Sequence, residues 1–407
     1  MISDYRLVAK SWQTPFVVLL GGCLISLVGF GARSSYGLYL GPMTFDLNWT
    51  RETFALAMAL QNLFWGICLP LAGILVDRYG PLWVVIGGAL IYALGTFGMT
   101  WVESSGSLYL AGGILVGTGV AFTSFSLVTA TMVRVVGAQR RSLVMGLCTA
   151  AGSVGQVLYW PITQGMISSH GWSSALVVTA VSVCLIIPLA FMLPNDPRVR
   201  DENVVHTGSI GAMREAFAHR GFLLLTAGFF VCGFHVAFIT VHLPVYVSDL
   251  GLGSMVGAIA ISLIGIFNIA GSLLSGAFGQ RFSKKWGLSG IYAIRAVTLL
   301  VFLIAPKSEL TIYIFAATMG LLWLSTVPLT AGIIAQVFGI RYMATLYGFV
   351  FLGHQIGSFI GVWMGGYIYD LTGSYDLMWQ AGIILGLGAA LIHLPINEQP
   401  VPRLQVE

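Results

Sequence analysis

Long apolar runs, separated only by short polar segments, dominate this sequence of 407 residues. A soluble domain carries about 25% charged residues, whereas Asp, Glu, Lys and Arg make up 8% of this chain and the mean hydropathy is +0.89. So few charges cannot cover a water-exposed surface, so we expect most of the surface to face lipid. The runs are continuous and show no residue-by-residue alternation, which predicts membrane helices and not a membrane barrel.

The apolar runs divide into twelve segments that are long enough to cross a bilayer as helices. A helix needs about 20 mainly apolar residues to do so. The segments lie at 15–43, 51–77, 81–102, 107–134, 140–168, 173–193, 220–249, 253–280, 286–305, 309–338, 342–371 and 376–395. We therefore expect an all-α membrane protein with an N-terminal six-helix bundle at 1–193, a cytoplasmic linker at 194–219 and a C-terminal six-helix bundle at 220–407.

The distribution of lysine and arginine predicts the orientation of the chain. With the N-terminus in the cytoplasm, the 19 basic residues lie on the cytoplasmic side, apart from Arg33 and Arg295 within spans and Arg51 and Lys307 outside. Basic residues near span ends stay in the cytoplasm, so both termini are expected there, in a membrane of the bacterial inner-membrane type. The first run is too long for the apolar core of a cleaved signal peptide.

The sequence contains no indication of catalysis, of a metal site or of a cofactor. The five cysteines lie in apolar runs without paired spacing, which argues against a disulfide framework or a metal site. Motifs such as GxSxG, HExxH or a phosphate-binding loop do not occur where chemistry could use them. The net charge of +4 follows from membrane topology, so we expect no nucleic-acid partner. We expect a monomer that is not an enzyme.

Arg33 is the charged residue that most needs an explanation. It lies about 27 Å along its helix from Pro15, at 1.5 Å per residue, and a charge at that depth costs about 2.5–3.5 kcal/mol unless it faces a cavity or a partner. Ser34, Ser35 and Tyr36 follow it, which fits a water-filled cavity. A guanidinium matches a carboxylate with two parallel hydrogen bonds. We interpret Arg33 as an anion-binding residue; the alternative is an arginine that reaches the membrane surface and anchors its helix.

Acidic residues are informative through their positions. All 15 Asp and Glu residues fall at termini, loops or span ends. Arg33 therefore has no evident protein counter-ion within the bilayer, and the carboxylate of a substrate would supply one. The carboxylate proton relay of drug–proton antiporters has no candidate here.

Histidine is the remaining group that titrates near neutral pH, with an ordinary pKa of about 6.5. His235 and His242 lie in the span at 220–249, and His354 lies in the span at 342–371. His354 and His235 are the better candidates for proton coupling because their expected depth is close to that of Arg33. Each histidine is alternatively a neutral packing residue, and no spacing supports a metal site.

Other polar side chains lie at membrane depth and can shape a pocket or bond helices together. Arg295, in the ninth span, lacks a polar stripe around it, so a structural role is favoured over substrate binding: it bonds helix ends or contacts the eighth or tenth span. The amides are Gln61, Asn62, Gln156, Asn268 and Gln355.

The segment GILVDRYGP, which begins at Gly73, ends the second span. It resembles the signature of the major facilitator superfamily in the loop between helices 2 and 3. The resemblance covers the whole chain and implies two bundles with a substrate site between them. It also implies a conformational latch at Gly73, Asp77, Arg78 and Gly80. A second copy has Gln280 where an acid is usual.

A narrower resemblance is to the branch of monocarboxylate transporters and oxalate–formate antiporters. The segment FGARSSYGLY resembles its helix 1, where monocarboxylate carriers have a functional lysine at the position of Arg33. The segment YGFVFLGHQIGS resembles helix 11 of the oxalate carrier, whose functional lysine matches His354. Asn268 lies in a segment that resembles helix 8 of both kinds of carrier. The substrate-binding arginine of that helix corresponds to Ser272 in this sequence.

These features together predict a secondary active transporter that carries a small organic anion, a monocarboxylate, with a proton by alternating access. Two alternatives stay open: export of an amphipathic metabolite, siderophore or drug, and a membrane sensor that binds a ligand without flux. The expected substrate-binding residues are Arg33, Tyr36, His235, Asn268 and His354.

Overall fold

The computed structural model describes residues 12–124, 127–128, 131–132, 141–195, 209–339 and 343–401, and every regular element within these ranges is helical. The first half contains α1 (Pro15–Ser34), the 3₁₀ turn η2 (Ser35–Tyr39), α2 (Leu40–Asp46), α3 (Arg51–Tyr79), α4 (Pro81–Gly98), the 3₁₀ turn η3 (Met99–Trp101), α5 (Ser105–Leu108), the π-helical η4 (Tyr109–Leu115), α6 (Val116–Phe122), α8 (Arg141–Cys184) and α9 (Ile186–Ala190). The second half contains α10 (Ser209–Ala218), α11 (Arg220–Asp249), α12 (Ser254–Arg281), α13 (Lys284–Ile304), α14 (Glu309–Leu322), α15 (Thr326–Phe338), α16 (Met343–Thr372) and α17 (Asp376–His393).

Among the described residues, 11 helices are long and apolar enough to cross a membrane. One of them, at 146–190, has 45 residues and makes two crossings because the chain reverses at Gly171. Tyr159 donates a hydrogen bond of 2.8 Å to Ser182, and these residues lie at nearly equal distances on either side of Gly171. Gly171 has φ 81° and ψ 164°, which only glycine adopts readily. The predicted all-α fold with twelve membrane spans is therefore confirmed.

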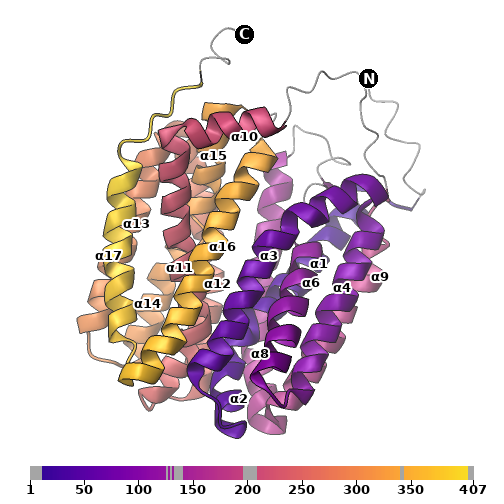
Figure 1. The fold of residues 1–407 in the computed structure, drawn as a ribbon, viewed down its shortest axis with the longest axis vertical. Helices are drawn as coiled ribbons and strands as arrows, with labels where there is room; N and C mark the ends of the chain where they lie inside the picture. Colours follow the sequence, from indigo (N-terminus) through magenta and orange to yellow (C-terminus); the bar gives the residue numbers. More distant parts are fainter. Residues whose placement is uncertain are drawn as a thin grey trace.

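The spans form two helical groups side by side, as Figure 1 shows. The helices α1 to α9 make one bundle and α11 to α17 make the other. The helix α10 lies across the end of the molecule at which α1 begins and α17 finishes, and α2 lies at the opposite end. We call these the α10 end and the α2 end.

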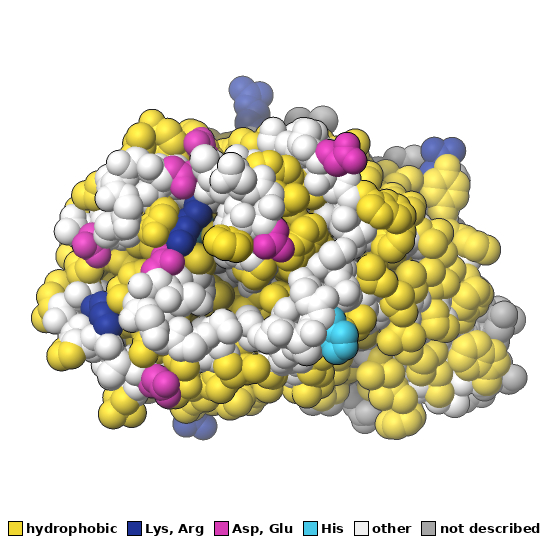
Figure 2. All heavy atoms as spheres, turned by 90° about the horizontal axis from the view of Figure 1, so that it is seen from below, with side chains coloured by type: hydrophobic (Ala, Val, Ile, Leu, Met, Phe, Trp, Pro, Cys, Tyr) yellow, Lys and Arg dark blue, Asp and Glu magenta, His cyan; other side chains and the backbone are white. Residues whose placement is uncertain are grey.

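The flanks of the bundles are strongly apolar. Leu94, Leu274, Ile304 and Leu391 are 63%, 65%, 74% and 65% exposed, which water would not favour but hydrocarbon accommodates. Figure 2 looks onto the α2 end, where acidic and basic side chains gather while apolar side chains cover the flanks. The protein is an integral membrane protein.

Glycines allow the closest helix contacts within each bundle. A Cβ on Gly155 of α8 would lie 2.0 Å from the carbonyl oxygen of Leu27 in α1. In the second bundle, a Cβ on Gly357 of α16 would lie 2.0 Å from the carbonyl oxygen of Phe230 in α11. Small residues of this kind bring membrane helices into backbone contact, and the two pairs occupy comparable places in their bundles.

The two bundles contact each other through α3 with α16, α8 with α12, and η2 with α11. A Cβ on Gly37 of η2 would lie 2.2 Å from the carbonyl oxygen of Thr240 in α11. A Cβ on Gly66 of α3 would lie 2.9 Å from Cβ of Gln355 in α16. The first contact joins the first membrane span of each bundle, and the second joins α3 to α16.

Candidate functional site

The first membrane span changes its helical form directly after Arg33. The α-helix α1 ends at Ser34 and continues as the 3₁₀ turn η2. The hydroxyls of Ser34 and Ser35 donate to the carbonyls of Gly31 and Ala32 at 2.8 and 2.9 Å, a side-chain to backbone bonding that bends helices. The break places Arg33 at the interface between the bundles.

Arg33 is held by neutral partners. Its Nη2 donates to Oδ1 of Asn62, and Nδ2 of Asn62 in turn donates 2.8 Å to the carbonyl of Met58. The Cζ atom lies 4.5 Å from the ring centre of Trp65, within cation–π range. Within the described residues, no carboxylate pairs with Arg33, and the one ion pair joins Arg51 to Asp249. The guanidinium is therefore oriented while its charge is not compensated.

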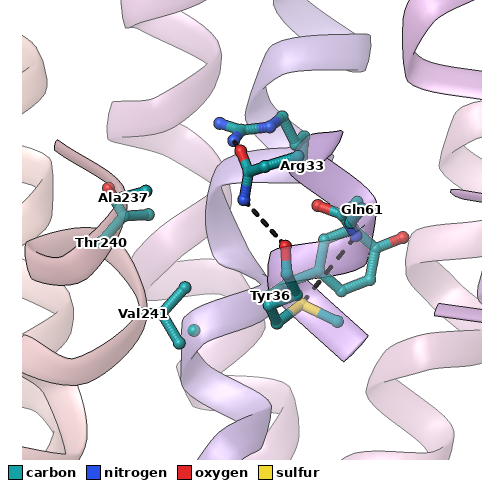
Figure 3. Close-up of a pocket in the computed structure, with 9 residues that line it drawn as sticks. Arg33, Tyr36, Gln61, Ala237, Thr240 and Val241 are labelled. Carbon is teal, nitrogen blue, oxygen red and sulfur yellow. Dashed lines mark hydrogen bonds between the residues drawn. The ribbon is translucent and has the colours of Figure 1, made fainter. Parts of the chain in front are cut away.

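A small cavity lies on the α2 side of Arg33, between the bundles. Arg33, Tyr36 and Asn62 line it from the first bundle, and Thr240 and Val241 line it from α11 (Figure 3). Its volume is about 10 Å³, roughly the room that one water molecule needs. The hydroxyl of Tyr36 bonds with that of Thr96, so this side chain presents mainly its ring. We call this space the Thr240 cavity.

His354 lies near Arg33 but is separated from it by two aromatic rings. Trp65 packs edge-on against Phe351 across the bundle interface, with ring centres 5.3 Å apart. Phe351 lies parallel to the ring of His354 at 5.6 Å. Nδ1 of His354 bonds with Oε1 of Gln355 at 3.1 Å. Arg33 and His354 are thus linked through packing and not through direct contact.

The other two histidines of the sequence analysis lie away from the Thr240 cavity. His235 is 2% exposed and its Nε2 bonds with the carbonyl of Gly382 at 2.8 Å, inside the second bundle. His242 bonds through Nε2 to the carbonyl of Val362 at 2.8 Å and through Nδ1 to the hydroxyl of Tyr375 at 3.1 Å. Burial raises the pKa of Tyr375, so its hydroxyl remains protonated and donates to His242.

Asn268 links the bundles. Its Nδ2 donates 3.1 Å to the hydroxyl of Ser153 in α8, and its Oδ1 accepts from the backbone N–H of Leu324 at 3.0 Å. The same oxygen accepts from Ser272 at 3.2 Å, the position at which the branch has its arginine. Both atoms of the amide are occupied, and the side chain is fully buried.

Arg295 bonds to a helix end, which is one of the structural roles expected from the sequence. It is fully buried, and its Nη2 donates to the carbonyls of Leu322, at 2.6 Å, and of Trp323. These carbonyls terminate α14, where the helix dipole attracts a cation. Arg295 therefore stabilises the break between α14 and α15.

The α2 end carries a network that joins the bundles. Arg51, at the start of α3, donates to both carboxylate oxygens of Asp249 at 2.6 and 2.7 Å and to the hydroxyl of Tyr375 at 3.1 Å. The carboxylate of Asp370 in α16 accepts from the backbone N–H groups of Arg51 and Glu52 at 3.1 and 2.7 Å, which caps α3. These contacts close the α2 end.

The predicted latch segment connects α3 to α4. Gly80 has φ 80°, and a Cβ there would lie 2.1 Å from Oδ1 of Asn195. Gly73 lies in open surroundings, and Arg78 is exposed with its Cζ 5.2 Å from the ring of Tyr79. The side chain of Asp77 lies outside what the structure describes.

Comparison with known proteins identifies the family. The sequence pattern of the Major Facilitator Superfamily matches residues 22–361 and again residues 258–405. The chain belongs to the major facilitator superfamily. The resemblance seen in the sequence is therefore confirmed, and the chain is a transporter of this superfamily.

Relatives within the superfamily agree with the predicted branch. Monocarboxylate transporter 13 of Rattus norvegicus is 26% identical over 394 residues, which cover 93% of this chain and 89% of that protein. The oxalate:formate antiporter of Oxalobacter formigenes is 24% identical over 403 residues, covering 98% and 93%. A bacterial homolog of the human lysosomal transporter Spinster, in an inward-facing and occupied conformation, has the same fold, with a TM-score of 0.78, 13% identity and coverage of 97% and 100%.

Trp65 is one of the site residues that could not be singled out from the sequence. It lies three residues after Asn62 in α3, so both side chains lie on one face of that helix. A signal was present in this spacing, since an amide and an indole share the face. A tryptophan is a large apolar side chain that packs in many protein cores, so the residue type alone did not distinguish it.

Proposed function

We propose that this transporter carries a small organic anion, a monocarboxylate, across the membrane by alternating access together with a proton. Arg33 binds the carboxylate, and Tyr36 and Asn62 shape the surroundings of the guanidinium. The observation that carries the proposal is a guanidinium at membrane depth whose partners within the described residues are all neutral.

The chemistry of Arg33 supports an anionic substrate. A buried cation needs a partner with charge or a wet surrounding, and a carboxylate provides both charge and matching geometry. Asn62 and Trp65 fix the plane of the guanidinium. Substrate binding therefore loses little side-chain entropy at Arg33. The named substrates of the relatives, monocarboxylates, oxalate and formate, belong to the same chemical class.

Alternating access gives roles to the two ends of the molecule. We take the bundles at 1–193 and 220–407 as the moving bodies and 194–219 as the cytoplasmic linker. The excess of basic residues assigns the α10 end and both termini to the cytoplasm of a bacterial-type inner membrane. The network around Arg51 and Asp249 then holds the outer side closed, and the latch of Gly73, Asp77, Arg78 and Gly80 acts at the inner side.

His354 is the proposed proton-coupling residue. It is linked to Arg33 through Trp65 and Phe351, so movement of one ring shifts the others. His235 and His242 are weaker candidates because their bonds lie within the second bundle or at the α2 end. Asn268 and Ser272 serve the bundle contact beside α14.

Transport by the wild-type protein in proteoliposomes tests the proposal. Labelled formate, acetate, lactate and pyruvate are offered with and without an inward proton gradient, and empty liposomes provide the background. We expect saturable uptake of at least one of them, faster with the gradient. Binding without uptake would indicate a sensor, and uptake of none of them, with export of a larger amphipathic compound, would indicate an exporter.

A further inference from the structure

A second cavity lies on the α10 side of Arg33, inside the first bundle. Ser26 and Gly29 line it from α1, Trp65 lines it from α3, and Thr123 lines it at the end of α6, with Arg33 as the wall shared with the Thr240 cavity. Its volume is about 20 Å³, which is room for one or two water-sized groups. We call this space the Ser26 cavity.

Three residues that line the Ser26 cavity carry buried polar atoms without a partner among the described residues. They are Oγ of Ser26, Nε of Arg33 and Nε1 of Trp65. Ser26 is 2% exposed and Trp65 is 7% exposed. Buried donors in native proteins are almost always satisfied, and three unsatisfied ones around one cavity call for a ligand that accepts hydrogen bonds.

The chemistry of these three groups selects an anion. The Nε–H of Arg33 and the Nε1–H of Trp65 only donate, and the hydroxyl of Ser26 donates or accepts. A carboxylate has two oxygens that accept several hydrogen bonds. A positive guanidinium in the wall favours a charged acceptor over a neutral one.

We propose that the Ser26 cavity is the subsite for the carboxylate head of the transported anion. Ser26 and Trp65 donate to the carboxylate from one side while Arg33 supplies the charge. This inference rests on the proposed function, since it locates the head group of that same substrate. The size of the cavity leaves room for little beyond the head, so anions with short chains are bound best.

Gly29→Ala is the sharpest test because it fills the subsite without disturbing the helix. A Cβ on Gly29 has Cδ1 of Ile186 at 3.8 Å and the carbonyl oxygen of Thr123 at 3.9 Å as its nearest neighbours, which is ordinary contact. Alanine also favours the helix over glycine. We expect unchanged or higher thermal stability and at least about tenfold weaker binding of a carboxylate, because the head loses its contact with a charged donor. Gly290→Ala in α13 is the matched control, since its Cβ meets nothing within 4 Å.

Two further variants remove single donors. Trp65→Phe keeps a ring beside Arg33 but removes the N–H, and Ser26→Ala removes the hydroxyl. We expect each to weaken binding about tenfold, the loss typical of one hydrogen bond to a charged acceptor. Trp379→Phe and Thr330→Val are matched controls in the second bundle, because both side chains are buried and have unpartnered polar atoms.

Calorimetric titration of the purified full chain with sodium formate, acetate, lactate and pyruvate, and with neutral acetamide, gives the readout. Weaker binding in Gly29→Ala, Trp65→Phe and Ser26→Ala, with wild-type binding in the three controls, supports the subsite. Wild-type affinity in those three variants, with binding lost in Arg33→Ala, overturns the subsite and leaves the proposed function intact. Wild-type affinity in Arg33→Ala, or no binding of any of the four anions by the wild type, overturns both.

Discussion

The partners of Arg33 orient it without neutralising it. Asn62 accepts one hydrogen bond and Trp65 offers the negative face of its ring. Both interactions are worth less than a buried ion pair, so an incoming carboxylate competes with them successfully. The residue is fixed in position and remains available for a substrate.

Asn62→Asp tests this arrangement by supplying the missing counter-ion. The new carboxylate lies where Oδ1 of Asn62 already meets Arg33, so it pairs with the guanidinium permanently. We expect uptake of the transported anion to fall about 100-fold, since competing with a close buried charge pair costs about 2–5 kcal/mol. The melting temperature should be unchanged or higher. Proteoliposome uptake is the measurement, and wild-type uptake by Asn62→Asp would speak against a free positive charge at the site.

The variant Arg295→Met tests whether Arg295 stabilises the fold or binds the substrate. The variant removes the charged donor that binds the carbonyls of Leu322 and Trp323. We expect the free energy of unfolding to fall by about 2–3 kcal/mol, the range for hydrogen bonds from a charged group. Substrate affinity of the folded protein should be unchanged. Thermal unfolding and calorimetric titration check this, and a loss of affinity at full stability would assign Arg295 to the substrate instead.

Part of this site could be predicted from the sequence and part could not. Arg33 stands out because an arginine within an apolar run is costly, whatever its surroundings. Trp65 and Ser26 do not stand out, because their role depends on unpartnered atoms beside one cavity. His235 was expected near the depth of Arg33, but almost every face of α11 is buried, so hydropathy gives no indication of which face meets Arg33.

Several spans contain breaks that the apolar pattern did not predict, and two of these breaks lie beside Gly37 and Asn268. Segments 15–43 and 309–338 were expected as continuous helices, whereas η2 interrupts the first and residues 323–325 interrupt the second. Each break depends on partners from distant helices. Thr240 in α11 lies against Gly37, and Asn268 in α12 bonds to Leu324. Local residue preferences do not contain such contacts.

Gly37→Ala tests whether η2 must lie directly against α11. The added Cβ would lie 2.2 Å from the carbonyl oxygen of Thr240, so the two backbones must separate. We expect the free energy of unfolding to fall by about 1–3 kcal/mol, as for other overpacked contacts, and transport to slow. Thermal unfolding is the measurement, with Gly41→Ala as control, because its Cβ meets its nearest neighbour, Val245, at an ordinary 3.6 Å. Equal stability of both variants would contradict the close packing of η2.

For the molecule as a whole, the apolar runs and the polar segment at 194–219 that divides them were sufficient to predict twelve spans in two bundles. The conformational state could not be predicted in this way. It depends on whether Arg51, Asp249 and Asp370 meet, and these residues come from three helices of two bundles. Charged residues at span ends are expected in any membrane protein, so their pairing is visible only in the structure.

Opening of the α2 end should respond to the Arg51–Asp249 pair. Both side chains are partly exposed, at 16% and 31%, so we expect Arg51→Ala to weaken closure by about 1 kcal/mol, roughly a fivefold shift in population. With spin labels at Asn48 and Thr372, in a background without native cysteines, pulsed electron paramagnetic resonance should report a longer distance between the labels in Arg51→Ala than in the parent protein. The double variant Arg51→Asp, Asp249→Arg, in which the two charges are exchanged, should restore the short distance. An unchanged distance in Arg51→Ala would show that other contacts keep this end closed.

Uptake of the transported carboxylate by Arg33→Ala, compared with wild type and with Arg33→Lys, decides whether Arg33 binds the substrate. We expect carboxylate uptake by Arg33→Ala to fall to the level of empty liposomes, while its melting temperature shows that the protein is folded. Arg33→Lys should keep part of the activity because the positive charge remains. Uptake by Arg33→Ala at the wild-type rate would contradict the assignment of Arg33 as the anion-binding residue.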